Sequence, residues 1–469
     1  MGKPSNKLNT CLDAALAAAA AVCCAIMLRA GCAYVLDDPE TRGWLIVLLG
    51  VVLALGICPL AAFLMRRGGE KALGIVVFLL AFALRAAYVL QADSVPASDF
   101  ALEYDAALAL ANGDMSAFDT QYFTFWGYQI PFALYEALVI ALGGGVTVLG
   151  LLNALWGALT ALGVFVLAVR FAPRGAAFTA GALYALCPGA ILLTPALTNQ
   201  CIALFFFMLA LWLYLGAGWQ RALLAGAALG FGNLMRSEAA MLWCALLAAL
   251  VLTLTARSEP MKKALVRFAL LIAGFVLITA AVRGGIALSG IAPNGTGNSV
   301  PEWKLVLGLD TATLGRYDPN MEYLLYIEDG AQRQAAAMEA IRASLSSSED
   351  LFGFFWEKAE LFWGGYEESW LGVVNEYIYP LRFWDRVFFI AAALLALAGC
   401  FGLRESREET IARGAVFAMF CAYLLIEVQP RYRYFVWPFL LMLAAAGLGR
   451  LGKAFERLRA SGHRRAESV

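Results

Sequence analysis

The sequence is poor in the residues from which many soluble enzymes build their active sites. It contains one histidine, His463, near its C-terminal end, and only 15% of its residues are charged. A Ser-His-Asp triad, a histidine general base and a histidine-rich zinc site are therefore unsupported. The ten cysteines form no CxxC pair and lie at or within apolar runs, which indicates small buried side chains rather than a disulfide framework. Lys plus Arg and Asp plus Glu are equal, at 35 each, so net charge gives no reason to expect a nucleic-acid partner.

Apolar residues are abundant, at 62% of the chain, and they gather in long runs. Too little polar surface remains to solvate several soluble domains, whereas about 20 consecutive apolar residues suffice for a helix to span a bilayer. The sequence therefore predicts an all-α polytopic membrane protein with about twelve transmembrane helices. The predicted spans are residues 11–36, 44–65, 72–91, 147–169, 175–193, 201–217, 221–236, 238–256, 264–288, 386–403, 411–427 and 434–450.

Positive charge sets the expected orientation, because short cytoplasmic loops carry an excess of Lys and Arg. The basic clusters alternate along the chain only if both termini are cytoplasmic, in a multi-pass protein of the cell (plasma) membrane. The apolar run 130–142 is then a surface or re-entrant helix, since it is short and contains Glu136. Two large regions, 92–128 and 289–385, are expected on the extracytoplasmic side.

These features divide the chain into five expected parts. Residues 1–71 hold two N-terminal helices, 72–288 a core with the outer loop 92–128, and 289–385 the second outer region. Residues 386–450 hold the C-terminal spans and 451–469 a basic cytoplasmic tail. Helices are predicted in the second outer region near 331–346 and 351–363. The aromatic face of the latter suits either the lipid headgroup boundary or packing against the rest of the region.

The first outer loop contains six acidic residues and no Lys or Arg. A helix is expected to begin near Asp99 and to stop at Asn112-Gly113, a common helix terminator. Asp99 and Glu103 would then lie one turn apart on the same face. Either Asp99 serves chemistry at the membrane surface or it is an N-cap residue, for which Asp is favoured.

Arginines stand at two expected outer helix ends, where the bias of positive charge toward the cytoplasm disfavours them. Arg236 is followed closely by Glu238, so it either pairs with that residue or faces a ligand. Arg431 and Arg433 flank Tyr432, and they indicate either a bound anion or an interfacial anchor.

A further polar outer turn, 195–200, contains Asn199 and Gln200. Acidic groups on one outer loop would face arginines at outer helix ends, beneath two large loops. This layout suits cleavage of a bond to a membrane-held phosphate, with a carboxylate accepting a proton and cations holding the leaving phosphate.

From about residue 72 onward the chain resembles the GT-C superfamily of membrane glycosyltransferases. Within that superfamily it is similar to bacterial relatives of protein O-mannosyltransferases and aminoarabinose transferases. The resemblance rests on the order of several motifs. They are Asp99 with Tyr104 and Asn112-Gly113-Asp114, then Gln129-Ile130-Pro131-Phe132, then Gly226 through Gly232 to Arg236-Ser237-Glu238, then the stretch from Gly308 to Glu322, and finally Gln429, Arg431, Tyr432 and Pro438.

The resemblance implies a polyprenyl-phosphate-linked sugar as donor, an acceptor in the cell envelope (glycan, lipid or protein) and inversion at the anomeric carbon. It also implies that Asp99 is the general base. Many members have Asp-Glu where this chain has Asp99-Phe100, so Glu103 is a second candidate. Donor phosphate would be held by Arg236, Arg431, Arg433 and Lys304, and substrates would be positioned by Tyr104, Asn199, Gln200, Glu238 and Tyr432.

No residues are assigned to a metal, although a divalent ion could share the phosphate using loop carboxylates. The N-terminal helices at 11–36 and 44–65 precede the core that the resemblance covers. A membrane transporter or lipid flippase is the alternative function. Such a protein more often shows repeated halves and ionisable sites near the bilayer midplane, whereas these sites gather at one face. A catalytically silent relative of the same fold is a further alternative.

Overall fold

The computed structural model describes residues 7–37, 42–64, 69–92, 94–365, 375–402 and 406–466. Over these ranges the protein is built from helices, without a β-strand. Helices occupy every predicted span. They are α1 (Lys7–Leu36), α2 (Gly43–Leu64), α3 (Glu70–Gln91), α7 (Val146–Ala168), α8 (Arg174–Leu186), α9 (Pro188–Leu192), α10 (Gln200–Tyr214), α11 (Trp219–Met235), α12 (Ala239–Thr255), α13 (Met261–Ser289), α17 (Asn375–Cys400), α18 (Arg407–Leu425) and α19 (Trp437–Ala466).

Six helices in the described part of the chain are long and apolar enough to cross a membrane. They are α1, α3, α7, α13, the 380–400 part of α17 and the 437–455 part of α19. The 43–57 part of α2, α10 and α12 are shorter apolar helices. The predicted all-α polytopic membrane fold is confirmed, and six of the expected spans meet this measure of length and composition.

The predicted continuous span 175–193 is wrong, because α8 ends at Leu186 and α9 begins at Pro188. Proline has no backbone N–H and cannot continue the hydrogen bonding of α8. The carbonyl groups left free at the end of α8 are taken up by Arg85 of α3. This fully buried guanidinium donates to the Ala185 carbonyl at 2.9 Å and to the Tyr184 carbonyl at 3.0 Å.

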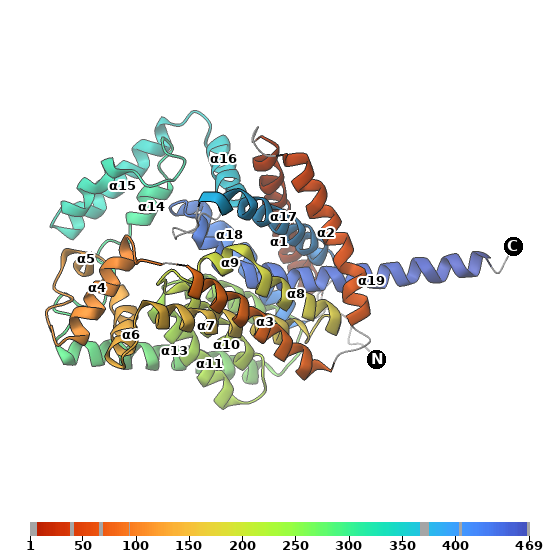
Figure 1. Ribbon diagram of the computed structural model, residues 1–469, viewed down its shortest axis with the longest axis horizontal. Coiled ribbons are helices and arrows are strands. Elements are labelled where there is room, and N and C mark those ends of the chain that lie inside the picture. The colour runs from red at the N-terminus through yellow and green to blue at the C-terminus, as the bar shows by residue number, and fades with distance from the viewer. Residues whose placement is uncertain are drawn as a thin grey trace.

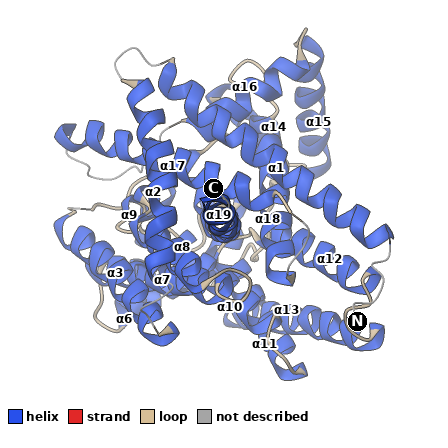
Figure 2. Cartoon of the chain, turned by 90° about the vertical axis from the view of Figure 1, so that its right-hand side faces the viewer, coloured by secondary structure: helices blue, strands red, loops and turns tan. Residues whose placement is uncertain are grey.

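The first half of α19 forms the centre of the bundle. Figure 2 looks along this helix, with α17, α18 and α8 around it, all of which pack against it. Glycines bring the backbones close: a Cβ on Gly447 would lie 2.1 Å from the Leu395 carbonyl oxygen of α17. Gly226 of α11 approaches α13 in the same way, 1.9 Å from the Leu271 carbonyl oxygen. Such small-residue contacts are typical of helices packed in lipid.

The two regions predicted outside both lie at one end of the bundle. The first contains α4 (Asp99–Ala111), α5 (Gln121–Phe125), η1 (Gly127–Gln129) and α6 (Ile130–Ala141). The second contains α14 (Trp303–Gly308), η2 (Pro319–Tyr326), α15 (Gly330–Ser347) and α16 (Leu351–Gly364). In Figure 1 these elements lie at the left and top, while both termini lie at the right. Which end faces the cytoplasm stays a prediction.

The predicted helices near 331–346 and 351–363 are confirmed as α15 and α16. The face of α16 that carries Ala359, Phe362 and Trp363 is buried, and the helix packs against α1 and α18. These residues therefore pack against helices of the bundle, which neither interpretation of the aromatic face had included. Phe352, on another side of α16, is 77% exposed.

The two outer regions are joined by backbone contacts. Trp126 forms an isolated antiparallel bridge with Asn298, and the Tyr128 amide donates to the Gly297 carbonyl at 3.1 Å. Gly127 allows this approach, because a Cβ there would lie only 2.5 Å from the Gly295 carbonyl oxygen. The loop after α5 and the loop after α13 consequently form one layer over the helix ends beneath.

Candidate active site

α4 carries the two candidate bases. Ser98, which has a φ of 55°, is the N-cap residue, and Asp99 is the first residue of the helix. The interpretation of Asp99 as the N-cap residue is therefore wrong. The predicted stop is confirmed: Asn112 follows α4, and Gly113 has a φ of 94°. Asp99 is half-buried, whereas Glu103, one turn later, is fully buried.

Glu103 occupies an apolar setting with one hydrogen bond. Its Oε1 accepts from the Tyr122 hydroxyl at 2.9 Å, and its Oε2 has no hydrogen-bond partner. Burial raises the pKa of Glu103 to about 8, with Asp99 adding to the rise and Tyr122, Arg236 and Arg431 opposing it. The carboxyl is therefore mostly protonated near neutral pH, which suits a hydrogen-bonding group better than a base.

Arg236 lies at the C-terminal end of α11 and meets the polar turn before α10. Its Nη1 donates to Asn199 Oδ1 at 2.8 Å, and its Nε lies 3.4 Å from Glu238 Oε1. Asn199 in turn donates to Gln129 Oε1 at 3.0 Å. The guanidinium carbon lies 5.3 Å from the centre of the Tyr432 ring. Arg236 is thus paired with Glu238, and it also connects the turn before α10, η1 (through Asn199) and Tyr432.

The final outer turn, η3 (Pro430–Phe435), and α14 each bring one further cation to the same place. The guanidinium carbon of Arg431 lies 5.2 Å from the centre of the Phe100 ring on α4. Its backbone carbonyl accepts from Gln200 Nε2 at 2.8 Å. Lys304 of α14 donates to the Tyr432 hydroxyl, and its Nζ lies 4.5 Å from the centre of that ring.

Two predicted site residues lie apart from this group. Arg433 is buried, and its Nη1 donates to the carbonyls of Gly365, at 2.7 Å, and Trp363, at 3.1 Å, at the end of α16. The structure therefore places its guanidinium against backbone rather than beside Arg431. Tyr104 is half-buried on α4, and no hydrogen bond in the described structure joins its side chain to the other predicted residues.

The structure adds residues that sequence reasoning did not assign. Tyr128 of η1 lies close enough to Lys304, Arg236 and Glu103 for their charges to act on its hydroxyl. Glu136 of α6 is fully buried, and neither of its carboxyl oxygens has a hydrogen-bond partner. Burial, with a contribution from Glu103, raises the pKa of Glu136 well above its usual range. The charged residue inside the short apolar run 130–142 was the available signal for Glu136.

Lys358 of α16 holds the element that carries Lys304. This buried amine donates to the Gly308 carbonyl at the end of α14, and burial lowers its pKa to about 7. A Cβ on Gly308 would lie 2.3 Å from the carbonyl oxygen of Leu425, the last residue of α18. α14 is therefore packed tightly between α16 and the end of α18.

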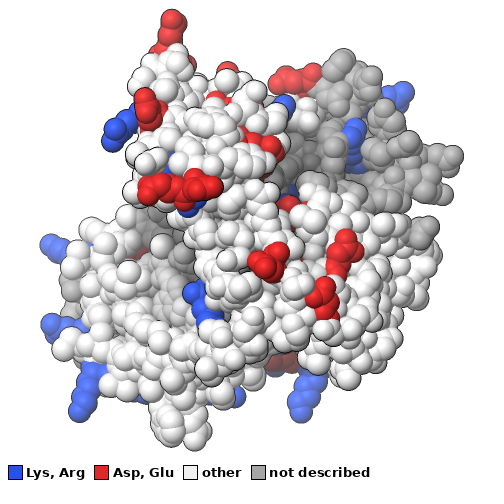
Figure 3. Space-filling view, turned by 90° about the vertical axis from the view of Figure 1, so that its left-hand side faces the viewer, with Lys and Arg blue, Asp and Glu red and all other residues white. Residues whose placement is uncertain are grey.

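Described residues do not gather three His, Cys, Asp or Glu side chains in a group that could hold a metal. The residues present thus offer no ready-made set of ligands, and a divalent ion shared with a donor phosphate stays a hypothesis. Figure 3 looks onto this end of the molecule and shows a hollow between its upper and lower parts.

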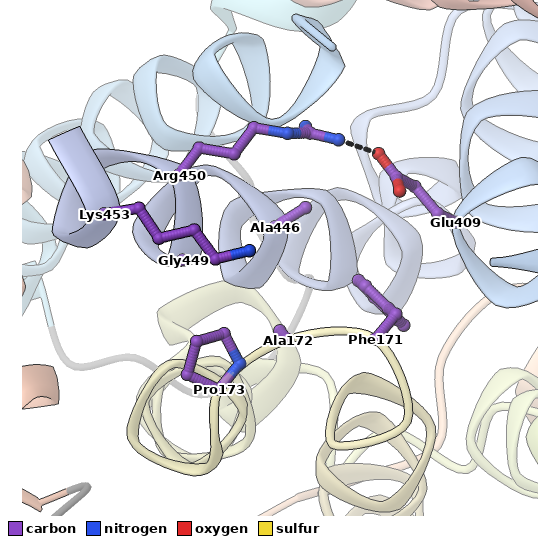
Figure 4. Close-up of a pocket in the computed structure, with 8 residues that line it drawn as sticks. All are labelled: Phe171, Ala172, Pro173, Glu409, Ala446, Gly449, Arg450 and Lys453. Carbon is purple, nitrogen blue, oxygen red and sulfur yellow. Dashed lines mark hydrogen bonds and ion pairs between the residues drawn. The ribbon is translucent and has the colours of Figure 1, made fainter. Parts of the chain in front are cut away.

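The opposite end has a small pocket of a different kind. It is lined by Phe171 to Pro173 after α7, by Ala446, Gly449, Arg450 and Lys453 of α19, and by Glu409 of α18 (Figure 4). Arg450 pairs there with Glu409, which also lies 2.6 Å from Arg413. These charges are mutually paired, which is typical of a structural network.

A family match covers α6 to α13, except for the first residue of α6 and the last residues of α13. Residues 131–282 match the dolichyl-phosphate-mannose-protein mannosyltransferase family. This match confirms the predicted resemblance and supports a membrane glycosyltransferase of the GT-C type. The matched segment includes Glu136, Asn199, Gln200, Arg236 and Glu238, while α4, Lys304 and η3 lie outside it. No curated protein matches the chain.

Proposed function

We propose that the protein transfers a sugar from a polyprenyl-phosphate-linked donor to an extracytoplasmic acceptor in the cell envelope, with inversion at the anomeric carbon. One observation carries this proposal. Three cations from separate elements gather at one end of a membrane bundle: Arg236 and Arg431 lie close to Glu103 of α4, and Lys304 lies close to Arg236. The family matched by residues 131–282 takes its name from a polyprenyl-phosphate sugar, which agrees with this donor class.

Asp99 is the proposed general base. An acceptor hydroxyl attacks the anomeric carbon as the bond from that carbon to the phosphate oxygen breaks. The acceptor proton passes to Asp99, and the bonding electrons leave with the polyprenyl phosphate. Asp99 suits this role better than Glu103, because Asp99 is half-buried at the start of α4 whereas Glu103 is buried and mostly protonated.

The cations stabilise the charge that develops on the departing phosphate. Such stabilisation is large where the cations are fixed in advance and shielded from water. Arg236 is fixed by Asn199 and Glu238, and Lys304 is fixed by Tyr432. Gln200 holds the backbone of Arg431. Arg433 contributes indirectly in this account, by bracing η3 against the end of α16.

The proposed orientation has both termini in the cytoplasm and the cluster outside. The lipid part of the donor would lie in the bilayer beside the apolar helices, with its phosphate at the level of Arg236. Tyr104, at the surface of α4, stays a proposed positioning residue for substrate.

The donor class is tested with the full chain in lipid nanodiscs. Polyprenyl-phosphate monosaccharides carrying a labelled sugar, mannose first, are supplied together with a cell-envelope extract as acceptor, and nucleotide sugars are supplied in parallel. We expect label transfer from the polyprenyl-phosphate donor alone and a product of inverted anomeric configuration by NMR. Transfer from nucleotide sugars, or movement of the intact donor across the bilayer without sugar transfer, would refute the proposal.

A further inference from the structure

The second outer region carries exposed tyrosines that the proposed transfer step does not use. η2 is a 3-10 helix in which Tyr323 and Tyr326 stand three residues apart, and residues at this spacing lie directly above one another. Their exposed fractions are 54% and 66%, and Tyr317, just before η2, is 50% exposed. We call these three residues, Tyr317, Tyr323 and Tyr326, the tyrosine surface.

The other side of η2 accounts for its folding. Leu324 is buried in a cluster with Val306 of α14 and Ala337 of α15, and Met321 and Ile327 pack against the same cluster. These apolar residues also recur every three positions, so one side of the helix faces the core and another faces water. The rings of Tyr323 and Tyr326 are therefore presented on a firmly packed element, on a side away from its buried residues.

The tyrosine surface is continuous with the candidate active site. The Tyr317 hydroxyl donates to Glu322, and Tyr317 lies close enough to Tyr326 and Glu427 for electrostatic interaction. Glu427 accepts from Gln429 Nε2 at 2.7 Å, and the Gln429 carbonyl accepts from the Tyr432 amide at 3.0 Å. A ligand lying on the tyrosines would therefore extend toward the turn that carries Arg431 and Tyr432.

The charge around the tyrosine surface narrows the chemistry of its ligand. Residues 316–333 contain four acidic residues, Asp318, Glu322, Glu328 and Asp329, against two basic ones, Arg316 and Arg333. Arg333 is paired with Glu302 at 3.2 Å, so the stretch has a net negative charge. Acidic groups are also prominent on the upper part of this end in Figure 3. Anionic lipid headgroups and phosphate-rich partners would be repelled.

A neutral carbohydrate can interact with both the tyrosine rings and the carboxylates. One face of a pyranose ring presents C–H groups that stack on aromatic rings, while its hydroxyl groups donate to carboxylates. Tyrosine provides a broad contact area with few rotatable bonds to immobilise. Exposed rings beside carboxylates, in a stretch of net negative charge, match this ligand better than an anionic membrane surface.

We infer that the tyrosine surface docks a carbohydrate chain, the glycan acceptor of the transfer, with Glu322 accepting its hydroxyl groups. The inference rests on the proposed function and makes the acceptor a glycan rather than a protein or a lipid. Tyr323 and Tyr326 provide stacking rings, and the end of the chain reaches the cations and Asp99.

The test uses the labelled full chain in nanodiscs on an array of neutral oligosaccharides. Serine- and threonine-containing peptides and phosphatidylglycerol vesicles are assayed alongside. We expect oligosaccharide binding that falls about tenfold or more when Tyr323 and Tyr326 are both changed to Ala. The double change to Phe keeps the rings and should stay within about threefold of the native protein. Phe352→Ala, at an exposed ring on α16, should leave binding unchanged.

Absence of oligosaccharide binding by the native protein would overturn the inference, as would equal binding by the double Ala variant. Peptide or vesicle binding that the double Ala variant loses would instead identify a different occupant and also overturn it. Donor binding is measured on the same samples and should be unchanged by every variant. A native protein that neither binds nor uses polyprenyl-phosphate sugars would refute the proposed function, whatever the array shows.

Discussion

The two ends of the bundle carry buried charge in different arrangements. At the end that holds the termini, Arg413 lies 3.6 Å from Asp13 of α1 and 2.6 Å from Glu409, and Glu409 also pairs with Arg450 of α19. At the other end, one oxygen of Glu103 and both oxygens of Glu136 have no hydrogen-bond partner. Lys304 and Arg431 there lie over aromatic rings.

In the proposed function, the first arrangement holds the fold and the second binds the substrate. Burying a carboxyl without a hydrogen-bond partner destabilises the folded state, and such groups are found mainly at functional sites. The Asp13, Glu409, Arg413 and Arg450 network joins α1, α18 and α19 through ion pairs. In the proposed function, a phosphate and a sugar bind beside the cations and carboxyls that surround Glu103 and Arg236.

The largest expected effect on stability comes from breaking the paired end. Arg413→Met should lower the free energy of unfolding by about 3–5 kcal/mol, because it removes the cation that lies against buried Asp13 and one of the two cations that pair with buried Glu409. Arg170→Ala removes the more exposed pair with Glu408, 3.4 Å apart, and should cost less than about 1 kcal/mol. Denaturant unfolding in detergent measures both. Equal losses would contradict the assignment of the network as structural.

The second prediction distinguishes the two arginines of η3, Arg431 and Arg433. Arg431→Ala should weaken donor binding by about 1.5–3 kcal/mol, and Arg431→Lys should restore it only in part, because an ammonium cannot replace the guanidinium fork. Arg433→Ala should instead lower thermal stability, since its guanidinium holds the carbonyls at the end of α16. Titration with a labelled polyprenyl-phosphate sugar and thermal unfolding distinguish the two. Unchanged donor affinity in Arg431→Ala would return this turn to an anchoring role.

A pH-dependent effect is expected from Glu103. Its pKa in the folded protein is raised to about 8, above the value of 4.5 for the unfolded chain. Between these two values the folded state binds the extra proton, so this group makes stability fall as pH rises from about 4.5 to about 8. Glu103→Gln should remove that slope and narrow the difference in melting temperature between pH 5 and pH 8. An unchanged difference would contradict the buried, neutral carboxyl.

Single-cysteine labelling, which should perturb the protein least, shows which end of the bundle lies on which side of the membrane. Single cysteines replacing Ser116 and Ser347, both exposed at the end with the cluster, should react with an impermeant thiol reagent in intact cells. A cysteine replacing Ser258, between α12 and α13, should react only after lysis. The experiment requires a cysteine-free background. The reverse pattern would invert the orientation.

Much of the fold follows from local sequence signals. Apolar runs predicted where the helices of the bundle lie, and Asn112-Gly113 predicted the end of α4 because glycine readily adopts positive φ. The break at Pro188 was missed, although proline supplied a local signal, because a buried arginine from the distant helix α3 completes the hydrogen bonding there. Composition alone does not reveal a partner 100 residues away in the chain.

The candidate site was predictable only in part. Asp99 and Glu103 were proposed from the acidic outer loop and from the resemblance, and Arg236 and Arg431 because positive charge at an outer helix end is conspicuous. The different surroundings of Arg433 and Arg431 were not predicted. Residues two apart in a 3-10 turn lie on different sides of it, whereas the interpretation from sequence treated the two arginines alike. Tyr122 and Tyr128 were missed because a tyrosine in an aromatic stretch carries no distinctive signal.

Replacement of Asp99 tests the central claim most directly. Asp99→Asn keeps the size of the side chain, but an amide does not accept a proton near neutral pH. We predict that it retains donor binding and loses turnover by about 10²–10⁴, while the exposed Asp105→Asn on the same helix has native activity. Sugar transfer in nanodiscs, run beside Glu103→Gln, provides the measurement. Native turnover in Asp99→Asn with an inactive Glu103→Gln would move the base to Glu103, and native turnover in both would contradict the carboxylate mechanism.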